Sequence, residues 1–300
     1  MNWIAVDWGT THLRAWLMSE GCKILEARHS DQGMATLKAN EFEAAILNLS
    51  RDWLSSNLKT PVIACGMVGA KQGWIEAPYS TVPCAPDAGT LIKPNVNDSR
   101  LDVFIRSGLS QKTPSADVMR GEETQISGLI AHNPDFDGVA CLPGTHTKWA
   151  HISTKEVVSF QTFMTGELFS LLCNYSVLKH SIPSEGWDQE CFEAAVKDVI
   201  SRPANIPAKL FELRASDLLQ GADKHGLRAA LSGYLIGLEL GGARPYWSGQ
   251  EIAMIGESNL TTLYAKALNL QGASCKIYDA TEMTISGLTA AFLSHKGSIQ

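Results

Sequence analysis

Two stretches of this chain repeat one pattern, in which an apolar strand enters a Gly-Thr turn and leaves as a second strand. The first copy spans residues 4–17, where the apolar run ends at Asp7 and the turn begins at Gly9. The second copy spans residues 139–152, with its turn at Gly144. Glycine allows a tight turn close to a ligand, and threonine hydroxyls and turn N–H groups can donate to phosphate oxygens. The repeat predicts a duplicated α/β fold that binds phosphate between its copies.

The composition argues against several classes of partner. The 300 residues carry a formal net charge of -6 and no run of lysine or arginine, so no basic surface for nucleic acid is expected. No apolar run approaches the roughly 18 residues of a membrane span, and no signal peptide is recognisable. The seven cysteines form no Cys-x-x-Cys pair, which argues against a disulfide framework or a zinc site. We therefore expect a cytoplasmic protein with reduced thiols that acts on small molecules, with a homodimer as an open option.

The rest of the chain alternates between strand and helix patterns. Asn40 and Glu43 have the spacing of a capping box at the start of a helix that continues to Leu54. A helix over 167–180 carries an apolar stripe that is expected to face the core: Leu168, Leu171, Leu172, Tyr175 and Leu178. Residues 67–93, rich in Gly, Pro and aromatic side chains, predict a long irregular excursion. Further strands are expected at 23–27, 61–66, 101–105, 251–258 (with its turn) and 276–278, and further helices at 121–132, 187–201, 209–220, 223–241, 260–268 and 281–294.

Two common nucleotide-binding motifs are missing from the sequence. There is no Gly-x-x-x-x-Gly-Lys-[Ser/Thr], which argues against a P-loop, and no Gly-x-Gly-x-x-Gly follows a strand, which argues against a Rossmann fingerprint. Asp7 instead stands at the end of the first strand, where a carboxylate can hold Mg²⁺ directly or through its waters. The sequence thus predicts a phosphate and metal site of another kind.

The order of these parts resembles the superfamily of acetate and sugar kinases, Hsp70 and actin. Three blocks, at residues 65–79, 119–125 and 142–149, are similar to signatures of the 2-dehydro-3-deoxygalactonokinases, and the resemblance runs from residue 3 to about residue 292. It implies two ribonuclease-H-like, actin-like ATPase domains with a nucleotide cleft between them. The N-terminal domain, 1–120, would bind sugar and the first phosphate turn, and the closing helix 281–300 would return to it. The C-terminal domain, 121–280, would bind nucleotide.

The resemblance also implies an activity and its cofactors. The chain would use ATP and Mg²⁺ to phosphorylate the C6 hydroxyl of 2-dehydro-3-deoxy-D-galactonate, a step of D-galactonate breakdown. Phosphoryl transfer depends mainly on positioning and charge neutralisation. Asp7 would organise Mg²⁺, and the two turns would donate to the phosphates. The donors on the turns are Gly9, Thr10, Thr11, Gly144, Thr145 and Thr147.

The sugar acid requires a base and a cation. Kinases of this superfamily often place a carboxylate after a Gly, shortly before the second phosphate motif; here Glu122 is the first choice and Glu123 the second. Three residues could receive the substrate carboxylate: Arg120, Lys71 and Arg106. Gln72, Trp74 and Glu76 could shape the sugar pocket, although Trp74 could equally belong to the domain core.

The nucleotide half departs from the superfamily pattern at two places. The second turn is preceded by Leu142 and Pro143 in place of an Asp, which leaves metal binding to Asp7. The adenosine turn has Gly256, Glu257 and Ser258 in place of a Gly-Gly pair, with a helix N-terminus behind it that would favour an anion.

Two alternative functions stay open at this point. The chain could be a kinase for another substrate, such as 2-dehydro-3-deoxygluconate or an anhydro-sugar, or it could be an actin-like or Hsp70-like ATPase switch.

Overall fold

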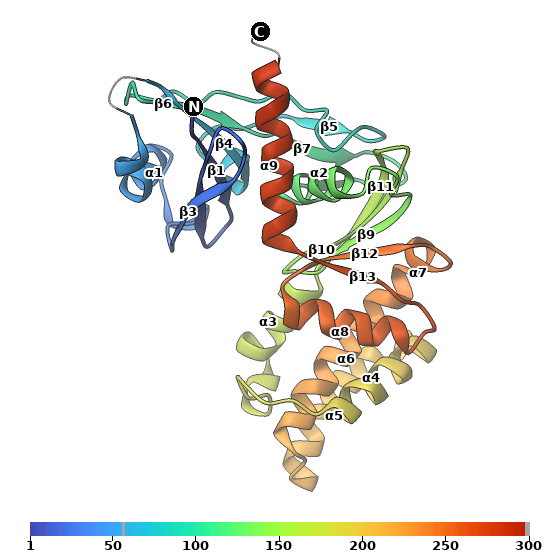
Figure 1. Cartoon of the computed structure of the whole chain (residues 1–300). Helices are drawn as coiled ribbons and strands as arrows, with labels where there is room; N and C mark the ends of the chain where they lie inside the picture. The colour runs from blue at the N-terminus through green and yellow to red at the C-terminus, as the bar shows by residue number, and fades with distance from the viewer. Residues whose placement is uncertain (56–57, 298–300) are drawn as a thin grey trace. The chain divides into compact units, whose positions relative to one another are not determined.

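Each Gly-Thr turn joins the first two strands of its own β-sheet in the computed structural model, which describes residues 1–55 and 58–297 (Figure 1). The chain divides into two units. Unit 1 comprises residues 1–137, 152–159 and the segment from Ala280 onward, and unit 2 comprises 138–151 and 160–279. The last three residues of the expected closing helix, 298–300, lie outside the described residues.

The sheet of unit 1 has the strand order β3-β2-β1-β4-β6. β1 pairs antiparallel with β2, and β2 pairs antiparallel with β3, whereas β1, β4 and β6 run parallel. The strands are β1 (Trp3–Trp8), β2 (Leu13–Met18), β3 (Ile24–Ser30), β4 (Thr60–Gly66) and β6 (Leu101–Ile105). The strands expected at 23–27, 61–66 and 101–105 are confirmed.

Both faces of this sheet are buried, because side chains alternate along each strand. Ile4 and Val6 pack in one cluster with Phe42 of α1 (Phe42–Ser50). Trp3 packs in another cluster with Phe292 of α9 (Ala280–Gly297), and the two rings stack with centroids 4.4 Å apart. Figure 1 shows α1 and α9 on opposite sides of the sheet.

The second sheet repeats the first in its order, β11-β10-β9-β12-β13. β9, β12 and β13 run parallel, as β1, β4 and β6 do. The strands are β9 (Gly138–Leu142), β10 (Thr147–Ser153), β11 (Glu156–Phe163), β12 (Ile252–Gly256) and β13 (Lys276–Asp279). The predicted duplication of an α/β fold is therefore confirmed at the level of strand order.

The helices of unit 2 enclose a core of their own. Phe192 of α4 and Ile236 of α6 pack with Met254 of β12 and Tyr264 of α8. The helices are α3 (Thr165–Tyr175), α4 (Gln189–Ser201), α5 (Ile206–Gln220), α6 (Lys224–Gly242), α7 (Arg244–Trp247) and α8 (Ser258–Asn269). Short 3₁₀ helices complete the chain: η1 (Met34–Thr36), η2 (Arg51–Trp53), η3 (Met67–Gly69), η4 (Val177–His180) and η5 (Pro203–Asn205).

In unit 1, α2 (Glu122–His132) approaches α9 closely through two glycines. A Cβ on Gly128 would lie 2.0 Å from the carbonyl oxygen of Met283, and a Cβ on Gly287 would lie 1.9 Å from that of Thr124. The small residues expected in the closing helix therefore permit close packing on α2. Among the described residues, no helix is long and apolar enough to span a membrane.

Three local predictions differ from the structure. Glu43 does not cap α1; its carboxylate accepts the N–H groups of Asn97 at 2.9 Å and Asp98 at 2.7 Å. On α3, Leu168, Leu171 and Tyr175 are exposed and do not face a core. The excursion after β4 also contributes to a small sheet that the pattern did not predict, formed by β5 (Tyr79–Thr81), β7 (Gly108–Gln111) and β8 (Asp117–Met119).

Candidate active site

The first Gly-Thr turn is held by a segment that follows β3. The carbonyl groups of Gly9 and Thr10 accept the N–H groups of Met34 at 3.0 Å and Ala35 at 2.9 Å. A Cβ on Gly33 would lie 2.2 Å from the carbonyl carbon of Thr11, so only glycine fits there. Thr10 and Thr11 are exposed, and within residues 1–55 and 58–297 nothing accepts their backbone N–H groups. The turn therefore offers these donors to a ligand.

The second turn is supported in the same way by the start of α3. A Cβ on Gly166 would lie 2.4 Å from the carbonyl oxygen of Gly144, and the N–H of Glu167 donates to the carbonyl of Thr145 at 3.0 Å. His146 Nε2 lies 2.6 Å from Glu167 Oε2. Each Gly-Thr turn is thus backed by a glycine that could not be replaced without moving the turn.

Two residues that follow the second turn point into unit 2. Thr147 is buried, with its hydroxyl 3.0 Å from the hydroxyl of Tyr264. Lys148 is also buried, and its Nζ donates to Thr162 Oγ1 at 2.9 Å. On this hairpin Thr145 and His146 are exposed and Gly144 is half-buried, so the turn is more accessible than Thr147 and Lys148.

Asp7 is paired with a residue that the sequence reasoning did not select. Arg14 lies directly opposite Asp7 in the β1–β2 register, and its guanidinium forms an ion pair with Asp7 Oδ2. Arg14 also donates to Thr281 Oγ1 at 3.3 Å. The hairpin pattern alone could have given this pair, because a four-residue turn after Trp8 places position 14 across from position 7. Cys65 Sγ lies 3.9 Å from Asp7 Oδ1, and burial raises the pKa of this thiol well above its usual value, which favours the neutral thiol over the nucleophilic thiolate.

Glu122 and Glu123 begin α2 at a close backbone contact. Gly121 and Gly66 both have positive φ angles, and a Cβ on Gly121 would lie 3.4 Å from Gly66 Cα. Glu122 is half-buried, and its Oε2 accepts the backbone N–H of Arg120 at 3.0 Å.

Glu123 is only 1% exposed and has both oxygens engaged. It accepts the N–H of Gly121 at 2.6 Å and the hydroxyl of Thr124 at 3.0 Å. Burial raises the pKa of Glu123 to about 7; the charge of Arg106 opposes this rise and that of Glu122 adds to it. The adjacent carboxylates therefore differ, since one is accessible and the other is enclosed.

Two arginines in unit 1 are buried without a full set of acceptors. Arg120 is 9% exposed; its Nη2 donates to the carbonyl of Ala77 at 2.8 Å and its guanidinium lies 4.3 Å from the ring centre of Tyr79. In the described part of the chain, its Nε and Nη1 and the Nε of Arg106 have no hydrogen-bond partner. A Cβ on Gly69 would lie 2.9 Å from Arg120 Nη1. Buried guanidinium N–H groups without partners are costly and point to an anionic ligand.

The other predicted sugar-site residues lie on the loop after β4. Lys71, Gln72 and Glu76 are exposed. Trp74 packs on Phe42 with ring centres 6.1 Å apart and meets Trp8 edge-on at 6.2 Å. This position matches the alternative in which Trp74 belongs to the domain core.

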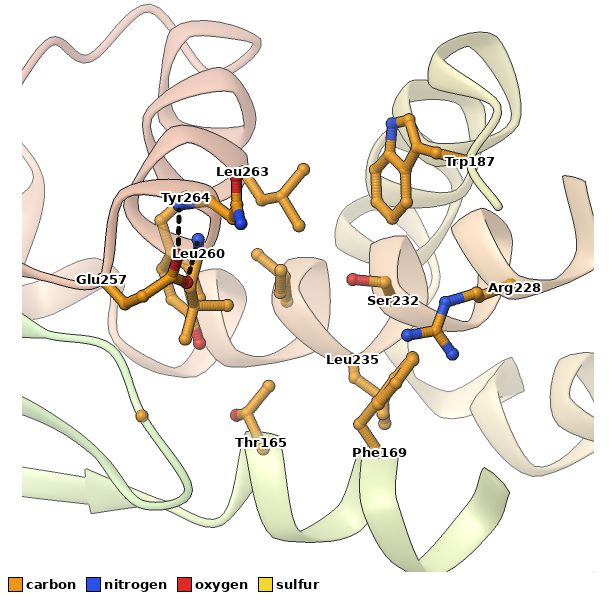
Figure 2. A pocket seen from close by; sticks show the side chains of 14 residues that line it. Thr165, Phe169, Trp187, Arg228, Ser232, Leu235, Glu257, Leu260, Leu263 and Tyr264 are labelled. Atoms are coloured by element: carbon orange, nitrogen blue, oxygen red, sulfur yellow. Dashed lines mark hydrogen bonds between the residues drawn. The ribbon is translucent and has the colours of Figure 1, made fainter. Parts of the chain in front are cut away.

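Unit 2 contains a pocket of about 310 Å³ between α3, α6 and α8. Figure 2 shows Glu257, Leu260 and Tyr264 on the α8 side and Trp187, Ser232 and Arg228 on the other, with Thr165 and Phe169 rising from α3. The Arg228 guanidinium lies 5.0 Å from the Phe169 ring centre. Gly144 of the second turn also lines this mostly apolar pocket, which suits a flat aromatic group attached to phosphate.

The predicted adenosine turn contributes only in part to this pocket. Glu257 lines the pocket, as does Asn259, whereas Gly256 and Ser258 are not among its lining residues. The carboxylate of Glu257 accepts the N–H groups of Asn259 at 3.1 Å and Leu260 at 3.3 Å, so the N-terminus of α8 is already capped and is not open to an anion.

Sequence reasoning missed most of the pocket wall because the wall comes from distant segments. One signal was available, since Glu239 is a lone carboxylate in the apolar second half of α6. Such a charge inside an apolar helix usually has dedicated partners. The missed lining residues are Thr165, Gly166, Phe169, Trp187, Arg228, Ser232, Leu235, Ile236, Asn259, Leu260, Leu263 and Tyr264.

Known proteins resemble the chain over almost its whole length. A family model described as 2-keto-3-deoxy-galactonokinase matches residues 7–291. The 2-dehydro-3-deoxygalactonokinase of Escherichia coli is 37% identical over 90% of both chains. A Rhizobium meliloti protein named as a probable 2-dehydro-3-deoxygalactonokinase is 39% identical over 96% of this chain and 95% of its own.

Solved structures agree with these sequence matches. A Sinorhizobium meliloti crystal structure given the same kinase name superposes with a TM-score of 0.90 at 38% identity and covers 97% of this chain and 96% of its own. The activator of a 2-hydroxyisocaproyl-CoA dehydratase from Clostridium difficile, with bound ADPNP, superposes with a TM-score of 0.55 at 11% identity over 99% of this chain and 97% of its own. The second likeness concerns the fold alone.

Proposed function

The chain belongs to the 2-keto-3-deoxy-galactonokinase family, and from that premise we propose that it transfers the γ-phosphoryl group of ATP to the C6 hydroxyl of 2-dehydro-3-deoxy-D-galactonate, a step of D-galactonate breakdown. The observation that carries the proposal beyond the family is the guanidinium of Arg120. It is buried, two of its donor nitrogens lack partners in the described chain, and it directly precedes the Gly-Glu-Glu segment. A kinase for an acidic sugar requires such a cation beside its base.

Arg120 receives the carboxylate of the sugar acid in this proposal. Hydrogen bonds from an arginine to a carboxylate are strong because both groups are charged, and two nitrogens of Arg120, Nε and Nη1, have donors without a partner in the described chain. These two nitrogens lie on different edges of the guanidinium, so either one can donate to the substrate carboxylate. The contacts to Ala77 and Tyr79 hold the guanidinium against the loop after β4. Arg106 and Lys71 remain the second and third choices, because Arg106 donates to two backbone carbonyls and Lys71 is exposed.

Glu122 acts as the base toward the C6 hydroxyl. Of the two adjacent carboxylates it is the more accessible, whereas both oxygens of Glu123 accept hydrogen bonds inside unit 1. As the C6 oxygen bonds to the γ-phosphorus, the bond from that phosphorus to the bridging oxygen of ADP breaks, and the hydroxyl proton passes to Glu122. Glu123 then serves to fix the start of α2 through Gly121 and Thr124.

Asp7 fits a metal that arrives with the nucleotide. Mg²⁺ in kinases is usually held by one or two carboxylates together with phosphate oxygens and waters, and Asp7 supplies one half-buried carboxylate. Among the described residues, no group of His, Cys, Asp or Glu side chains forms a complete metal site by itself. When bound, Mg²⁺ would neutralise charge on the β- and γ-phosphates. Arg14 holds Asp7 in place and adds a positive charge beside the first turn.

The nucleotide lies on unit 2, with its base in the pocket between α3, α6 and α8. The apolar wall and the Arg228–Phe169 pair suit the faces of a purine, and the exposed carboxylate of Glu257 can accept ribose hydroxyls. Gly144 lies at the edge of the same pocket, so the phosphates would continue toward the second turn. Transfer then requires this triphosphate to meet the sugar acid held on unit 1.

A coupled assay of ADP formation tests the proposal across a panel of acceptors. The panel contains 2-dehydro-3-deoxy-D-galactonate, its gluconate epimer, an anhydro-sugar and galactonate itself. The expected result is Mg²⁺-dependent turnover that is fastest with the 2-dehydro-3-deoxy-D-galactonate. Faster turnover with another acceptor would assign a different substrate, and ATP hydrolysis that ignores every acceptor would indicate a nucleotide switch.

A further inference from the structure

Glu239 is a buried carboxylate that the proposed chemistry does not use. It lies near the end of α6 and is 2% exposed. Its Oε1 accepts the indole N–H of Trp149 at 2.8 Å. Its Oε2 accepts the hydroxyl of Tyr264 at 2.7 Å and, in a shorter contact, the hydroxyl of Thr165. Three donors from three different elements therefore converge on one carboxylate.

These donors belong to parts of unit 2 that surround the nucleotide pocket. Trp149 is on β10, the strand that leaves the second phosphate turn. Thr165 lines the pocket and precedes Gly166, which touches the backbone of Gly144. Tyr264 of α8 lines the same pocket. Glu239 thus connects the turn, α3 and α8 from beneath the pocket.

Burial of the negative charge of Glu239 is unfavourable for folding when no other effect is considered. Burial raises the pKa of Glu239 to about 6, although the hydrogen bonds from Thr165, Tyr264 and Trp149 oppose the rise. Replacement of a buried charged group together with its partners by well-packed apolar side chains is often neutral for stability. A carboxylate in this place is better explained by the orientation that it imposes on its donors.

An ionised Glu239 also fixes where the hydroxyl protons point. Because a carboxylate only accepts, Tyr264 and Thr165 must donate to it. With the proton of Tyr264 used, Thr147 is the donor in its 3.0 Å contact with Tyr264. The hydroxyl proton of Thr147 then points inward, and phosphate donors on this hairpin are left to the turn itself.

We propose that Glu239 is a positioning residue of the nucleotide site, whose carboxylate orients Thr165, Tyr264 and Trp149 and thereby holds the Gly144–Thr145 turn in its phosphate-binding form. This inference rests on the proposed kinase function. It predicts that Glu239 affects the affinity for nucleotide and leaves the affinity for the sugar acid unchanged.

Glu239→Gln tests the proposal, because an amide keeps the shape and cannot accept at both of its heteroatoms. The expected result is a rise of about tenfold or more in KM for ATP and in the Kd for ADP measured by calorimetry, with KM for the sugar acid within about twofold of the parent. Tyr264→Phe removes one donor, keeps the ring, and should change the same two constants in the same direction by a smaller factor. Asp217→Asn, which alters an ion-paired carboxylate on α5, is the matched control and should leave all three constants unchanged.

The outcomes separate this inference from the proposed function. An active parent kinase whose ATP and ADP constants are unchanged in both Glu239→Gln and Tyr264→Phe would overturn the positioning role and leave the function intact. A parallel rise in KM for both substrates, or a lowered Tm with unchanged constants, would assign Glu239 to general stability. If Glu239→Gln does not fold, Tyr264→Phe decides by the same criteria.

Discussion

At the scale of single residues, unit 1 separates its charges by burial. Arg120 is enclosed with two donor nitrogens unpartnered in the described chain, Glu122 is accessible at the start of α2, and Glu123 is enclosed with both oxygens satisfied. A charged group in a dry site interacts strongly with a ligand of opposite charge because little water screens it. Substitutions at these three positions should therefore change different quantities: KM for the sugar acid, kcat, and the free energy of unfolding.

Arg120→Ala should weaken binding of the sugar acid selectively. Loss of hydrogen bonds to a charged group costs about 1.5–3 kcal/mol, so KM for the acid should rise about 10- to 100-fold while KM for ATP stays within about twofold. Steady-state kinetics with each substrate varied in turn gives both values. Arg100→Ala, which removes an arginine paired with Asp98, is the control and should change neither. An unchanged KM for the acid in Arg120→Ala would instead assign binding of the substrate carboxylate to Arg106 or Lys71.

Glu122→Gln should lower kcat by about two to four orders of magnitude, since a positioned base contributes that much to proton transfer. KM for both substrates should change by less than about threefold, because the amide preserves the shape. Single-turnover rates of the variant and of Glu123→Gln would compare the two carboxylates directly. A larger loss of rate in Glu123→Gln would transfer the role of base to Glu123.

Glu123 should make the stability of unit 1 depend on pH. Its pKa is raised from 4.5 in the unfolded chain to about 7 in the fold, so the folded state holds the proton more tightly. The contribution of Glu123 to the free energy of unfolding is fully present below pH 4.5 and is lost as the pH rises through 7. This contribution is about 3 kcal/mol at most. Glu123→Gln should therefore gain stability relative to the parent between pH 5 and pH 8. Denaturant unfolding at pH 5 and pH 8 measures this gain. A difference in the free energy of unfolding between variant and parent that is the same at both pH values would contradict it.

At the scale of elements, the two Gly-Thr turns depend on glycines that lie outside them. Gly33 follows β3 and Gly166 is the second residue of α3, and at both places a Cβ would lie less than 2.5 Å from the backbone of the turn. The turn sequence therefore specifies a shape that another segment must complete. This explains why a Gly-Thr motif alone is a weak predictor and why two supported copies are a strong one.

Gly166→Ala should displace the second turn and weaken nucleotide binding. The added methyl group would lie 2.4 Å from the carbonyl oxygen of Gly144, which forces the backbone to move. We expect KM for ATP to rise about tenfold, by analogy with the loss of one charge-assisted hydrogen bond. Gly241→Ala, at a helical position with no atom within 4 Å, is the matched control and should leave KM unchanged. Equal KM values in the two variants would show that the turn tolerates displacement.

The element scale also shows what the sequence could and could not predict. The strands of the first sheet and α2 follow from local apolar patterns and were predicted closely. The apolar stripe on α3 predicted a face packed against the core, but Leu168 and Leu171 on that face are 42% and 43% exposed. The capping box failed because Glu43 is bound by Asn97 and Asp98, which are distant in sequence. Long-range partners are invisible to a local pattern.

The same limit applies to the candidate site. Asp7, Glu122 and Arg120 could be selected because each stands beside a recognisable turn or helix start. The pocket in unit 2 could not be assembled in advance, since its walls come from α3, α6, α8 and Trp187. Glu239 could not be linked to this pocket from the sequence, because only the structure shows that three hydrogen-bond donors converge on its carboxylate.

At the scale of the whole molecule, one strand order occurs twice, and the two copies carry different candidate sites. Both sheets share one strand order, but the buried Arg120 belongs to unit 1 and the apolar pocket belongs to unit 2. Duplication explains the matched Gly-Thr turns, and the elements that only one copy carries explain the difference between the sites. The loop after β4 with the small sheet β5-β7-β8 belongs to the first copy, and helices α4, α5 and α6 belong to the second.

This division predicts separate footprints for the two substrates in amide hydrogen exchange. The sugar acid alone should slow exchange in residues 65–79 and 119–124, where Arg120 and the start of α2 lie. A non-hydrolysable ATP analogue with Mg²⁺ should slow exchange in residues 143–147, 165–169 and 257–264, because these surround the pocket and the second turn. The turn at residues 9–12 should also respond to the nucleotide, because the proposed function assigns Asp7 to Mg²⁺ and this turn to the phosphates. If the sugar acid alone protected the pocket on unit 2, or the nucleotide analogue left it unprotected, the assignment of the nucleotide base to that pocket would be wrong.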